Sequence, residues 1–266
     1  MNTSSNRALD SIAKHNQSVW DRQATENCRW STPVSEQEIA DARAGRPHII
    51  LTPDTPVPLE WLGELKGRDV LCLSSGGGQQ APLLAAAGAI VTSYDLSDKQ
   101  LALDQSVAKR EGLELKTIQG DMRDLGAIKD ASFDLIVHVC SNAFVPDIIP
   151  VWNECHRVLR SGGELLSGFL NPDSFIFDHE AIDRGEPLLA VNKLPYSDVD
   201  SVSPEHYQNK IDTHDLLEFS HSMSDQIGGQ IVAGFHIVGF FEDSWEECQP
   251  LNEFFPLLFA TRARKV

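Results

Sequence analysis

The sequence predicts an α/β fold: a doubly wound, mostly parallel seven-stranded sheet with helices on both faces. Short apolar runs alternate with helix-like stretches from residue 69 to residue 170. The runs are continuously apolar, which is typical of strands covered on both faces. A glycine-rich turn, Ser74-Ser75-Gly76-Gly77-Gly78, follows the first run, and an acidic residue follows each of the next two. Because strands alternate with helices, the crossovers should be right-handed and the strands parallel.

Residues 1–57 predict an N-terminal helical arm and a proline-rich linker. Ser35 and Glu38 have the spacing of a capping box, in which each side chain binds a free backbone N–H of the other, so a short helix should begin there and end near Gly45. Residues 52–58 contain too many prolines for a helix or a central strand. This segment should connect the arm to the sheet.

Residues 58–170 predict the core that binds the cofactor. A second capping-box pattern, Ser97 to Gln100, opens a helix that Gly112 ends. The expected strands are 69–73, 89–94, 115–119, 133–139 and 164–170, and the expected helices are 58–66, 79–87, 97–111 and 147–159.

After residue 170 the alternation stops. Residues 171–215 are polar with scattered aromatics and prolines, and a segment this long inside a compact domain is usually a lid or substrate loop. We therefore expect an inserted lid segment at 171–215. Residues 216–266 should complete the sheet, with a helix near 215–227 and strands near 236–241 and 255–261.

Composition excludes several classes of protein. With 39 acidic and 22 basic residues the formal charge is −17, which disfavours nucleic acid and anionic membranes as partners. No signal peptide or spanning run is visible, so we expect a cytoplasmic protein. The five cysteines are odd in number and lack CxxC spacing, and Cys155-His156 and His214-Asp215 lack further ligands at useful spacing. No disulfide framework and no metal site is expected.

The ends of three strands predict the cofactor class. The glycine turn lets the backbone approach a ligand closely. Asp95 ends the second strand, 19 residues after Gly76, where a carboxylate can accept both hydroxyls of a ribose. Asp121 ends the third strand, where it can accept from an adenine amino group while Met122 covers the ring. Together they favour a ligand that contains adenosine.

These motifs resemble those of class I S-adenosylmethionine-dependent methyltransferases. Residues 70–78 look like the nucleotide loop of that family, 94–97 like its ribose motif, 120–122 like its adenine motif, 133–137 like its fourth strand and 157–165 like the turn before its fifth. The resemblance covers about 58–170, more weakly 215–263, and its nearest branch is the ubiquinone/menaquinone-biosynthesis-like methyltransferases. It implies a Rossmann-like fold, S-adenosylmethionine as cofactor and S-adenosylhomocysteine as product.

The resemblance also implies a set of contact residues. The cofactor-binding residues should be Ser74, Ser75, Gly76, Gly77, Gly78, Asp95, Leu96, Gln100, Asp121, Met122 and His138. Two positions depart from the family pattern: Cys72 stands where an acidic residue is usual, and Ser74 where a glycine is usual. The contact that the acidic residue gives the methionine amino group must be replaced or lost, and the hydroxyls of Ser74 and Ser75 are candidates to replace it.

Methyl transfer from a sulfonium needs alignment rather than an enzyme nucleophile. The segment after the fourth strand offers His138 as a general base or, equally, as a residue that only contacts the cofactor. Ser141, Asn142 and Phe144 could shape the acceptor pocket. Trp20 and Trp30 of the arm could close over the site or merely dock the arm.

Our interpretation is a methyltransferase acting on a small-molecule acceptor, as a monomer or homodimer. One alternative is a nicotinamide-dependent oxidoreductase, which shares the glycine loop and the strand-end acid but usually has GxGxxG. The other is a non-catalytic protein that binds or senses S-adenosylmethionine, because fold alone does not fix function. The arm (residues 1–45) and the lid segment should together cover the acceptor side of the cofactor.

Overall fold

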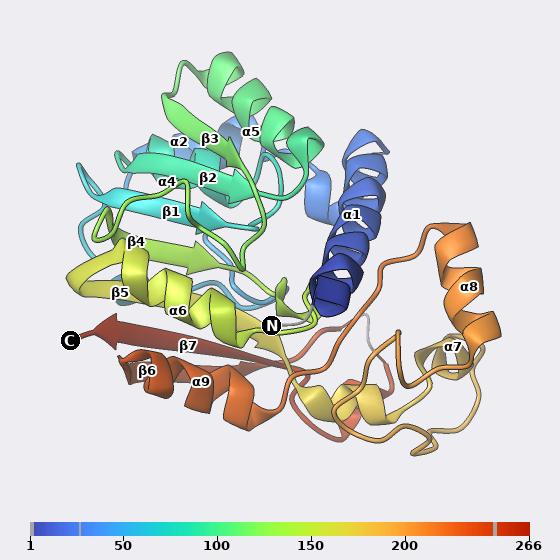
Figure 1. Ribbon diagram of the computed structural model, residues 1–266. Helices are drawn as coiled ribbons and strands as arrows, with labels where there is room; N and C mark the ends of the chain where they lie inside the picture. Colours follow the sequence, from blue (N-terminus) through green and yellow to red (C-terminus); the bar gives the residue numbers. More distant parts are fainter. Residues whose placement is uncertain (1–2, 27, 247–248) are drawn as a thin grey trace.

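The computed structural model, which describes residues 3–26, 28–246 and 249–266, is built on one seven-stranded sheet (Figure 1). The strands lie in the order β3-β2-β1-β4-β5-β7-β6, and only β7 runs antiparallel to its neighbours. This order confirms the doubly wound, mostly parallel sheet. The strands are β1 (Asp69–Leu73), β2 (Ile90–Asp95), β3 (Leu115–Gln119), β4 (Phe133–His138), β5 (Leu159–Leu170), β6 (Phe235–Asp243) and β7 (Leu258–Lys265).

The central strand β1 supplies side chains to both faces of the sheet. Val70 and Cys72 join the apolar cluster on one face, whereas Leu71 and Leu73 join the cluster on the other. The first face is covered by α2 (Glu36–Arg43), α3 (Leu59–Leu62), α4 (Gln80–Ala86) and α5 (Asp98–Glu111), and the second by α6 (Ile149–Val158) and α9 (Gly229–Ala233). Burial on both faces explains why the strand sequences are continuously apolar.

The arm begins with α1 (Thr3–Thr25), which packs beside α5 and crosses the end of the sheet (Figure 1). A 3-10 turn, η1 (Arg29–Ser31), leads to α2. The capping box predicted at α2 is confirmed: Ser35 Oγ accepts from the backbone N–H of Glu38, and Glu38 accepts from the N–H of Ser35. The arm therefore reaches the edge of the sheet where the parallel strands end.

The bounds predicted for the helix at 215–227 are wrong, because helical structure begins only at residue 223 and runs to residue 233. Residues 216–220, which we call the return segment, run extended, and Phe219 forms an antiparallel bridge with Ser197. A π-helical turn, η4 (Ser224–Gly228), and α9 follow. The side chains of Leu217 and Phe219 are buried against other elements, so tertiary contacts override the local preference for helix.

The lid segment contains two helices that the sequence analysis missed, α7 (His179–Asp183) and α8 (Pro204–Thr213). Each has a signal: Asp178 and Ser203 cap them through side-chain oxygens, and Pro204 occupies the first turn of α8. Their buried faces are small, which hid the apolar period from the sequence.

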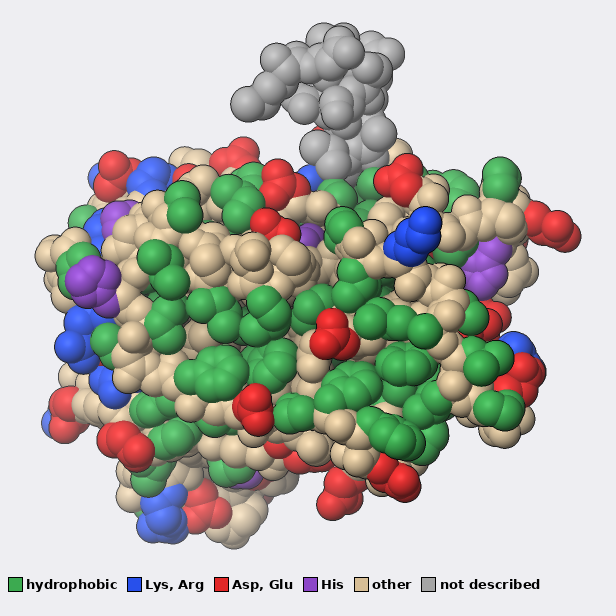
Figure 2. All heavy atoms as spheres, turned by 90° about the horizontal axis from the view of Figure 1, so that it is seen from below, with side chains coloured by type: hydrophobic (Ala, Val, Ile, Leu, Met, Phe, Trp, Pro, Cys, Tyr) green, Lys and Arg blue, Asp and Glu red, His purple; other side chains and the backbone are tan. Residues whose placement is uncertain are grey.

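Beyond β7, strand β6 forms the outer edge of the sheet. Elements α9 and β6 lie low in Figure 1 and expose Val232 and Phe240, and Figure 2 shows apolar side chains gathered on the face seen from below. Within the described residues, no helix is both long and apolar enough to cross a membrane.

Candidate functional site

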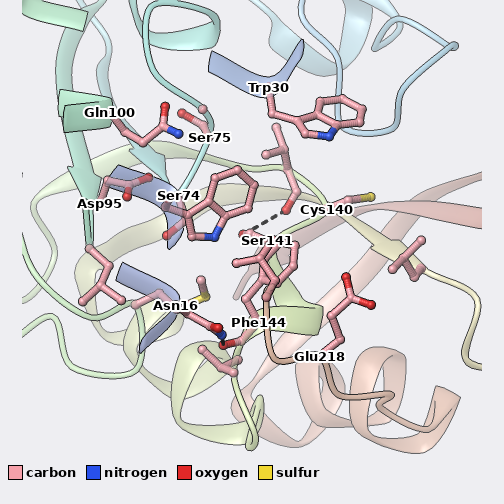
Figure 3. A pocket seen from close by; sticks show the side chains of 18 of the residues that line it. Asn16, Trp30, Ser74, Ser75, Asp95, Gln100, Cys140, Ser141, Phe144 and Glu218 are labelled. Atoms are coloured by element: carbon pink, nitrogen blue, oxygen red, sulfur yellow. Dashed lines mark hydrogen bonds between the residues drawn. The ribbon is translucent and has the colours of Figure 1, made fainter. Parts of the chain in front are cut away.

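A cavity of about 310 Å³ lies where β1, β2, β3 and β4 end. Figure 3 shows Asp95, Ser74, Ser75 and Gln100 at one end of this cavity and Glu218 at the other. The walls come from the strand ends, from α1 and η1, from the return segment and from Trp245. The cavity is therefore closed partly by elements far from the sheet in sequence.

The turn after β1 has the backbone that a ligand cradle needs. Ser74 adopts φ +47° and Gly76 φ +79°, both in the left-handed region that favours glycine. A Cβ on Gly76 would stand 2.8 Å from the Trp30 carbonyl oxygen, so η1 packs directly on the turn. Ser75 lines the cavity, and its buried hydroxyl lies beside the thiol of Cys72.

Gly77 and Gly78 do not contact the cavity, contrary to the sequence-based expectation. The N–H of Gly77 donates to Gln100 Oε1 at 2.7 Å, and the N–H of Gly78 donates to Asp104 Oδ1 at 2.7 Å. A Cβ on Gly77 would meet the Gln100 carbonyl oxygen at 2.5 Å. These glycines let the turn pack against α5 rather than touch a ligand.

Gln100 uses its capping position in an unexpected way. Its N–H donates to Ser97 Oγ, as in a capping box, but its side chain does not return to Ser97. The carboxamide instead accepts from Gly77 and donates to Ser31 Oγ at 2.7 Å. Gln100 thus joins the glycine turn to the arm, and it also lines the cavity.

Asp95 lies at the end of β2, as predicted, and Leu96 lines the cavity beside it. Burial raises the pKa of Asp95 to about 7, and the negative charge of Asp21 on α1 adds to the shift. One carboxylate oxygen accepts the Ser97 N–H at 2.8 Å. Asp95 is therefore a carboxyl group that gains from further hydrogen-bond donors.

Asp121 and Met122 follow β3 and line the same cavity. Arg123 binds the Asp121 carboxylate. Its backbone N–H donates to Oδ1 at 2.9 Å, and its guanidinium donates to both oxygens. Arg123 itself lines the cavity and was missed from sequence. This pairing fixes the orientation of Asp121, and Met122 supplies an apolar surface next to it.

His138 does not have the position that a general base needs. Its side chain is fully buried and does not line the cavity. Its ring nitrogens lie against Leu73 O, at 2.9 Å, and Asn142 Oδ1, and burial lowers its pKa. Asn142 is buried as well, and its amide donates to Gln226. Both side chains are therefore buried outside the cavity, where they hold the end of β4 and the turn after it in position.

Three of the expected acceptor residues do line the cavity: Ser141, Phe144 and Trp20. Trp20 of α1 packs edge-on against Phe144 of η2 (Asn142–Phe144), with ring centroids 5.2 Å apart. Trp30 packs against Trp245 at 5.6 Å, and both rings line the cavity. The arm therefore contributes aromatic walls, as the sequence suggested.

The main residue missed from sequence is Glu218 on the return segment. No local motif marks it, because a carboxylate in a polar stretch usually faces solvent. Asn16 of α1 is a second omission: its side-chain amide donates to Leu217 O and Phe144 O, and its oxygen accepts the Leu217 N–H. The contacts with Leu217 join residues 201 positions apart and the contact with Phe144 joins residues 128 apart, which no spacing argument detects.

Cys72 stands inside β1 and does not line the cavity. Burial raises the pKa of its thiol well above the usual range. The acidic residue usual at this position has no direct substitute there. No cluster of three metal-ligating side chains occurs among the described residues.

The cavity fits an adenosine-containing cofactor on its own geometry. The turn at Gly76 has no room for a side chain, and Asp95 offers a carboxylate oxygen at the next strand end. Met122 and Leu96 supply apolar surfaces near the third strand end and the second. Polar groups and apolar side chains therefore lie together at the ends of β1, β2 and β3. This is the edge of the sheet at which such folds bind their ligands, where the strand order reverses.

Comparisons with known proteins agree with this geometry. Residues 71–167 match the model of a methyltransferase domain family. A Bacillus subtilis protein named as an uncharacterized methyltransferase, YbaJ, is 43% identical over 97% of this chain and 100% of its own length. A ubiquinone biosynthesis O-methyltransferase of Pseudomonas syringae is 30% identical, over 53% of this chain and 60% of its own, so that branch is a distant relative.

Solved structures share the fold at low sequence identity. The S-adenosylmethionine-dependent methyltransferase of Mesorhizobium loti superposes with a TM-score of 0.59 at 18% identity and covers 77% of this chain and 94% of its own. One from Methanosarcina mazei gives 0.53 at 19% identity, over 78% and 95%. The comparisons support the methyltransferase interpretation and neither alternative.

Proposed function

The chain belongs to the class I S-adenosylmethionine-dependent methyltransferases, and we propose that it transfers the methyl group to a small molecule held between the strand ends and the arm. The observation that carries this proposal is one cavity with Ser75 and Asp95 at one end and Glu218 at the other, which Asp121, Trp20 and Phe144 also line. One end fits the cofactor, and the other is large and apolar enough for an acceptor.

We assign roles to the residues that line the cofactor end. Asp95 would accept the ribose hydroxyls, and Asp121 the adenine amino group, with Met122 and Leu96 against the ring. Ser74 and Gly76 would place the backbone against the methionine portion, and Ser75 would hydrogen-bond to it. Gln100 would act by holding the turn. When bound, S-adenosylmethionine supplies an electrophilic methyl group on a sulfonium.

The arm and the return segment would exclude water and align the acceptor. Trp20 and Phe144 pack against each other and line the cavity, and aromatic faces favour cations such as a sulfonium. Alignment of the reacting atoms and exclusion of water can supply much of the acceleration of such a displacement. Three points stay predictions: the division of the chain into segments at residues 57, 170 and 215, its state as a monomer or homodimer, and its cytoplasmic location.

The test is calorimetric titration with S-adenosylmethionine and S-adenosylhomocysteine. Asp95→Ala should weaken binding by about 1.5–3 kcal/mol, the range for hydrogen bonds to a charged group. Asp98→Ala is the matched control, because Asp98 lies three residues away but is exposed, pairs only with Lys99 and lies outside the cavity. Equal affinities for both variants would remove Asp95 from the cofactor site.

A further inference from the structure

A second cavity, of about 540 Å³, lies next to the first inside the lid segment. Three residues line both cavities: Leu170, Glu218 and Trp245. Aromatic side chains of Phe175, Phe177 and Tyr196 line the second cavity, and Phe175 stacks on Tyr196 with ring centroids 5.5 Å apart. Polar and charged side chains, among them His179 and Lys210, line it as well. The second cavity, which we call the lid chamber, therefore offers aromatic surface to the body of a molecule and polar groups around it.

The backbone around Glu218 is held on both sides. Asn16 binds the N–H and the carbonyl of Leu217, and the Phe219 N–H donates to Ala143 O at 2.8 Å. The N–H of Glu218 donates to Asp198 Oδ2 at 2.7 Å, and its carbonyl accepts the Asp198 N–H. These bonds fix the backbone at Glu218, and in Figure 3 its side chain points toward the region of Cys140 and Ser141.

The carboxylate of Glu218 differs from the other carboxylates of the lid chamber. Asp198 forms an ion pair with Lys210 at 3.0 Å and accepts from the Tyr196 hydroxyl at 2.6 Å. Asp178 caps α7, and Glu180 is exposed, within 3.7 Å of His206. No described residue donates a hydrogen bond to the Glu218 carboxylate, although it is half-buried.

Electrostatics at this point favours a cation. Burial raises the pKa of Glu218, and Asp198 adds to the shift while the charges of Lys210 and His179 oppose it. A carboxyl group in that state gains most from a donor that carries positive charge, because a charged hydrogen bond stabilises its ionised form. A second carboxylate or a phosphate would add to the repulsion already present.

We propose that the methyl acceptor is an amine, that Glu218 binds its ammonium group and removes its proton, and that the lid chamber holds the body of the molecule. This inference rests on the proposed methyltransferase function. The amine nitrogen enters as an ammonium group, and one N–H proton passes to a Glu218 oxygen. The freed lone pair forms the N–CH₃ bond while the S–CH₃ bond breaks and leaves its electron pair on sulfur. The proton on Glu218 then returns to solvent.

The experiment measures binding to the protein saturated with S-adenosylhomocysteine. The probes are 2-phenylethylamine, 2-phenylethanol and phenylacetate, which share one aromatic body and differ in the charge of the head group. Titration calorimetry should show that the amine binds at least about tenfold more tightly than the other two, as expected of a charge-assisted hydrogen bond. An alcohol or a carboxylate that binds equally well or better would overturn the proposal.

Variants assign the preference to Glu218. Glu218→Gln keeps the shape and should bring the amine to the affinity of the alcohol, whereas Glu205→Gln, which removes the same charge from an exposed position on α8 that does not line the lid chamber, should keep the preference. Glu218→Asp should keep most of the preference and lower the rate of amine methylation, because the carboxylate is drawn back by one carbon. An unchanged preference in Glu218→Gln would overturn the assignment.

The failure of this proposal can be told apart from failure of the proposed function. If the wild-type protein binds neither S-adenosylmethionine nor S-adenosylhomocysteine, both fall. If it binds both cofactors but shows no preference for the amine, only the amine proposal falls. Cofactor affinity in Glu218→Gln, together with its circular dichroism spectrum, confirms that the variant is folded.

Discussion

The two ends of the main cavity are built in different ways. The strand-end half, which is lined by residues 74–76, 95, 96, 100, 121 and 122, comes from short segments that follow parallel strands. The lid half, which is lined by six residues of the arm together with Leu216, Glu218 and Trp245, is assembled by side chains that bind backbone groups far away in sequence, as Asn16 does at Leu217. The first half follows from the topology of the sheet, and the second depends on a few polar contacts. The two halves should therefore respond differently to mutation.

The largest expected effect is that of Gly76→Ala, since Gly76 is where the two halves touch. Its φ of +79° and the Trp30 carbonyl at 2.8 Å from a Cβ mean that an alanine must strain the turn and displace η1. We expect cofactor affinity to fall at least about a hundredfold, measured by calorimetry.

Gly45→Ala is the matched control for this variant. Gly45 has φ +78° and nothing within 4 Å of a Cβ, so it carries the same backbone strain, about 1–2 kcal/mol, without the contact. Equal loss of binding in the two variants would show that strain alone, and not contact between the halves, is responsible.

The second prediction separates the lid half from the strand-end half. Asn16→Leu leaves the buried backbone groups of Leu217 without partners, which costs about 1–3 kcal/mol each. We expect the free energy of unfolding to fall by about 2 kcal/mol and turnover to fall about tenfold, with cofactor affinity nearly unchanged.

Arg22→Ala is the comparison variant. Arg22 also binds the chain near the return segment, at Thr213 O and His214 O, but these contacts are exposed. Its effect on stability should stay within about 0.5 kcal/mol. Urea unfolding and a methyl-transfer assay measure both variants, and a loss of cofactor affinity in Asn16→Leu equal to the loss of turnover would contradict the separation.

The strand-end half and the lid half also differ in how well the sequence predicted them. Ser74, Ser75, Gly76, Asp95 and Met122 could be found because each follows a strand whose apolar run is visible, and parallel strands end at one edge. The topology of the sheet was predictable for the same reason.

The lid half could not be predicted from local pattern. Glu218 reaches the cavity only because residues 216–220 run extended, and that conformation is fixed by Asn16 and Asp198, which lie 20 or more residues away. The sequence there favoured a helix. His138 was placed in the site because it ends β4, but its side chain packs against Trp152 of α6 and contacts Leu73 O and Asn142, away from the cavity.

The third prediction concerns the strand-end half alone. Asp95 has a pKa of about 7, because burial disfavours its charge, and ribose hydroxyls would stabilise the charged form. Binding should therefore release a proton below pH 7. Affinity for S-adenosylhomocysteine should rise about tenfold from pH 6 to pH 8 and level off above, because the free protein is largely protonated only at the lower pH.

Calorimetry across this range, with Asp95→Asn as control, measures the effect. The variant cannot titrate at this position, so its affinity should be lower and nearly independent of pH. A wild-type affinity that is flat or falls as the pH rises would show that the Asp95 carboxylate is not the acceptor of the ribose.

The smallest expected effect is at Ser74. Variants at this position test why serine stands in the strand-end half where the family usually has glycine. Its φ of +47° is the conformation for which the family usually has glycine. Ser74→Ala and Ser74→Gly both remove the hydroxyl, but only glycine relieves the backbone, so the glycine variant should be about 1 kcal/mol more stable than the alanine variant by thermal unfolding. If the hydroxyl contacts the cofactor, both variants should also lose affinity by a similar small factor, about threefold to tenfold. A glycine variant that is more stable than wild type and binds the cofactor more weakly would show that serine is kept for its hydroxyl. A glycine variant that binds the cofactor as well as wild type would show that the Ser74 hydroxyl takes no part in cofactor binding.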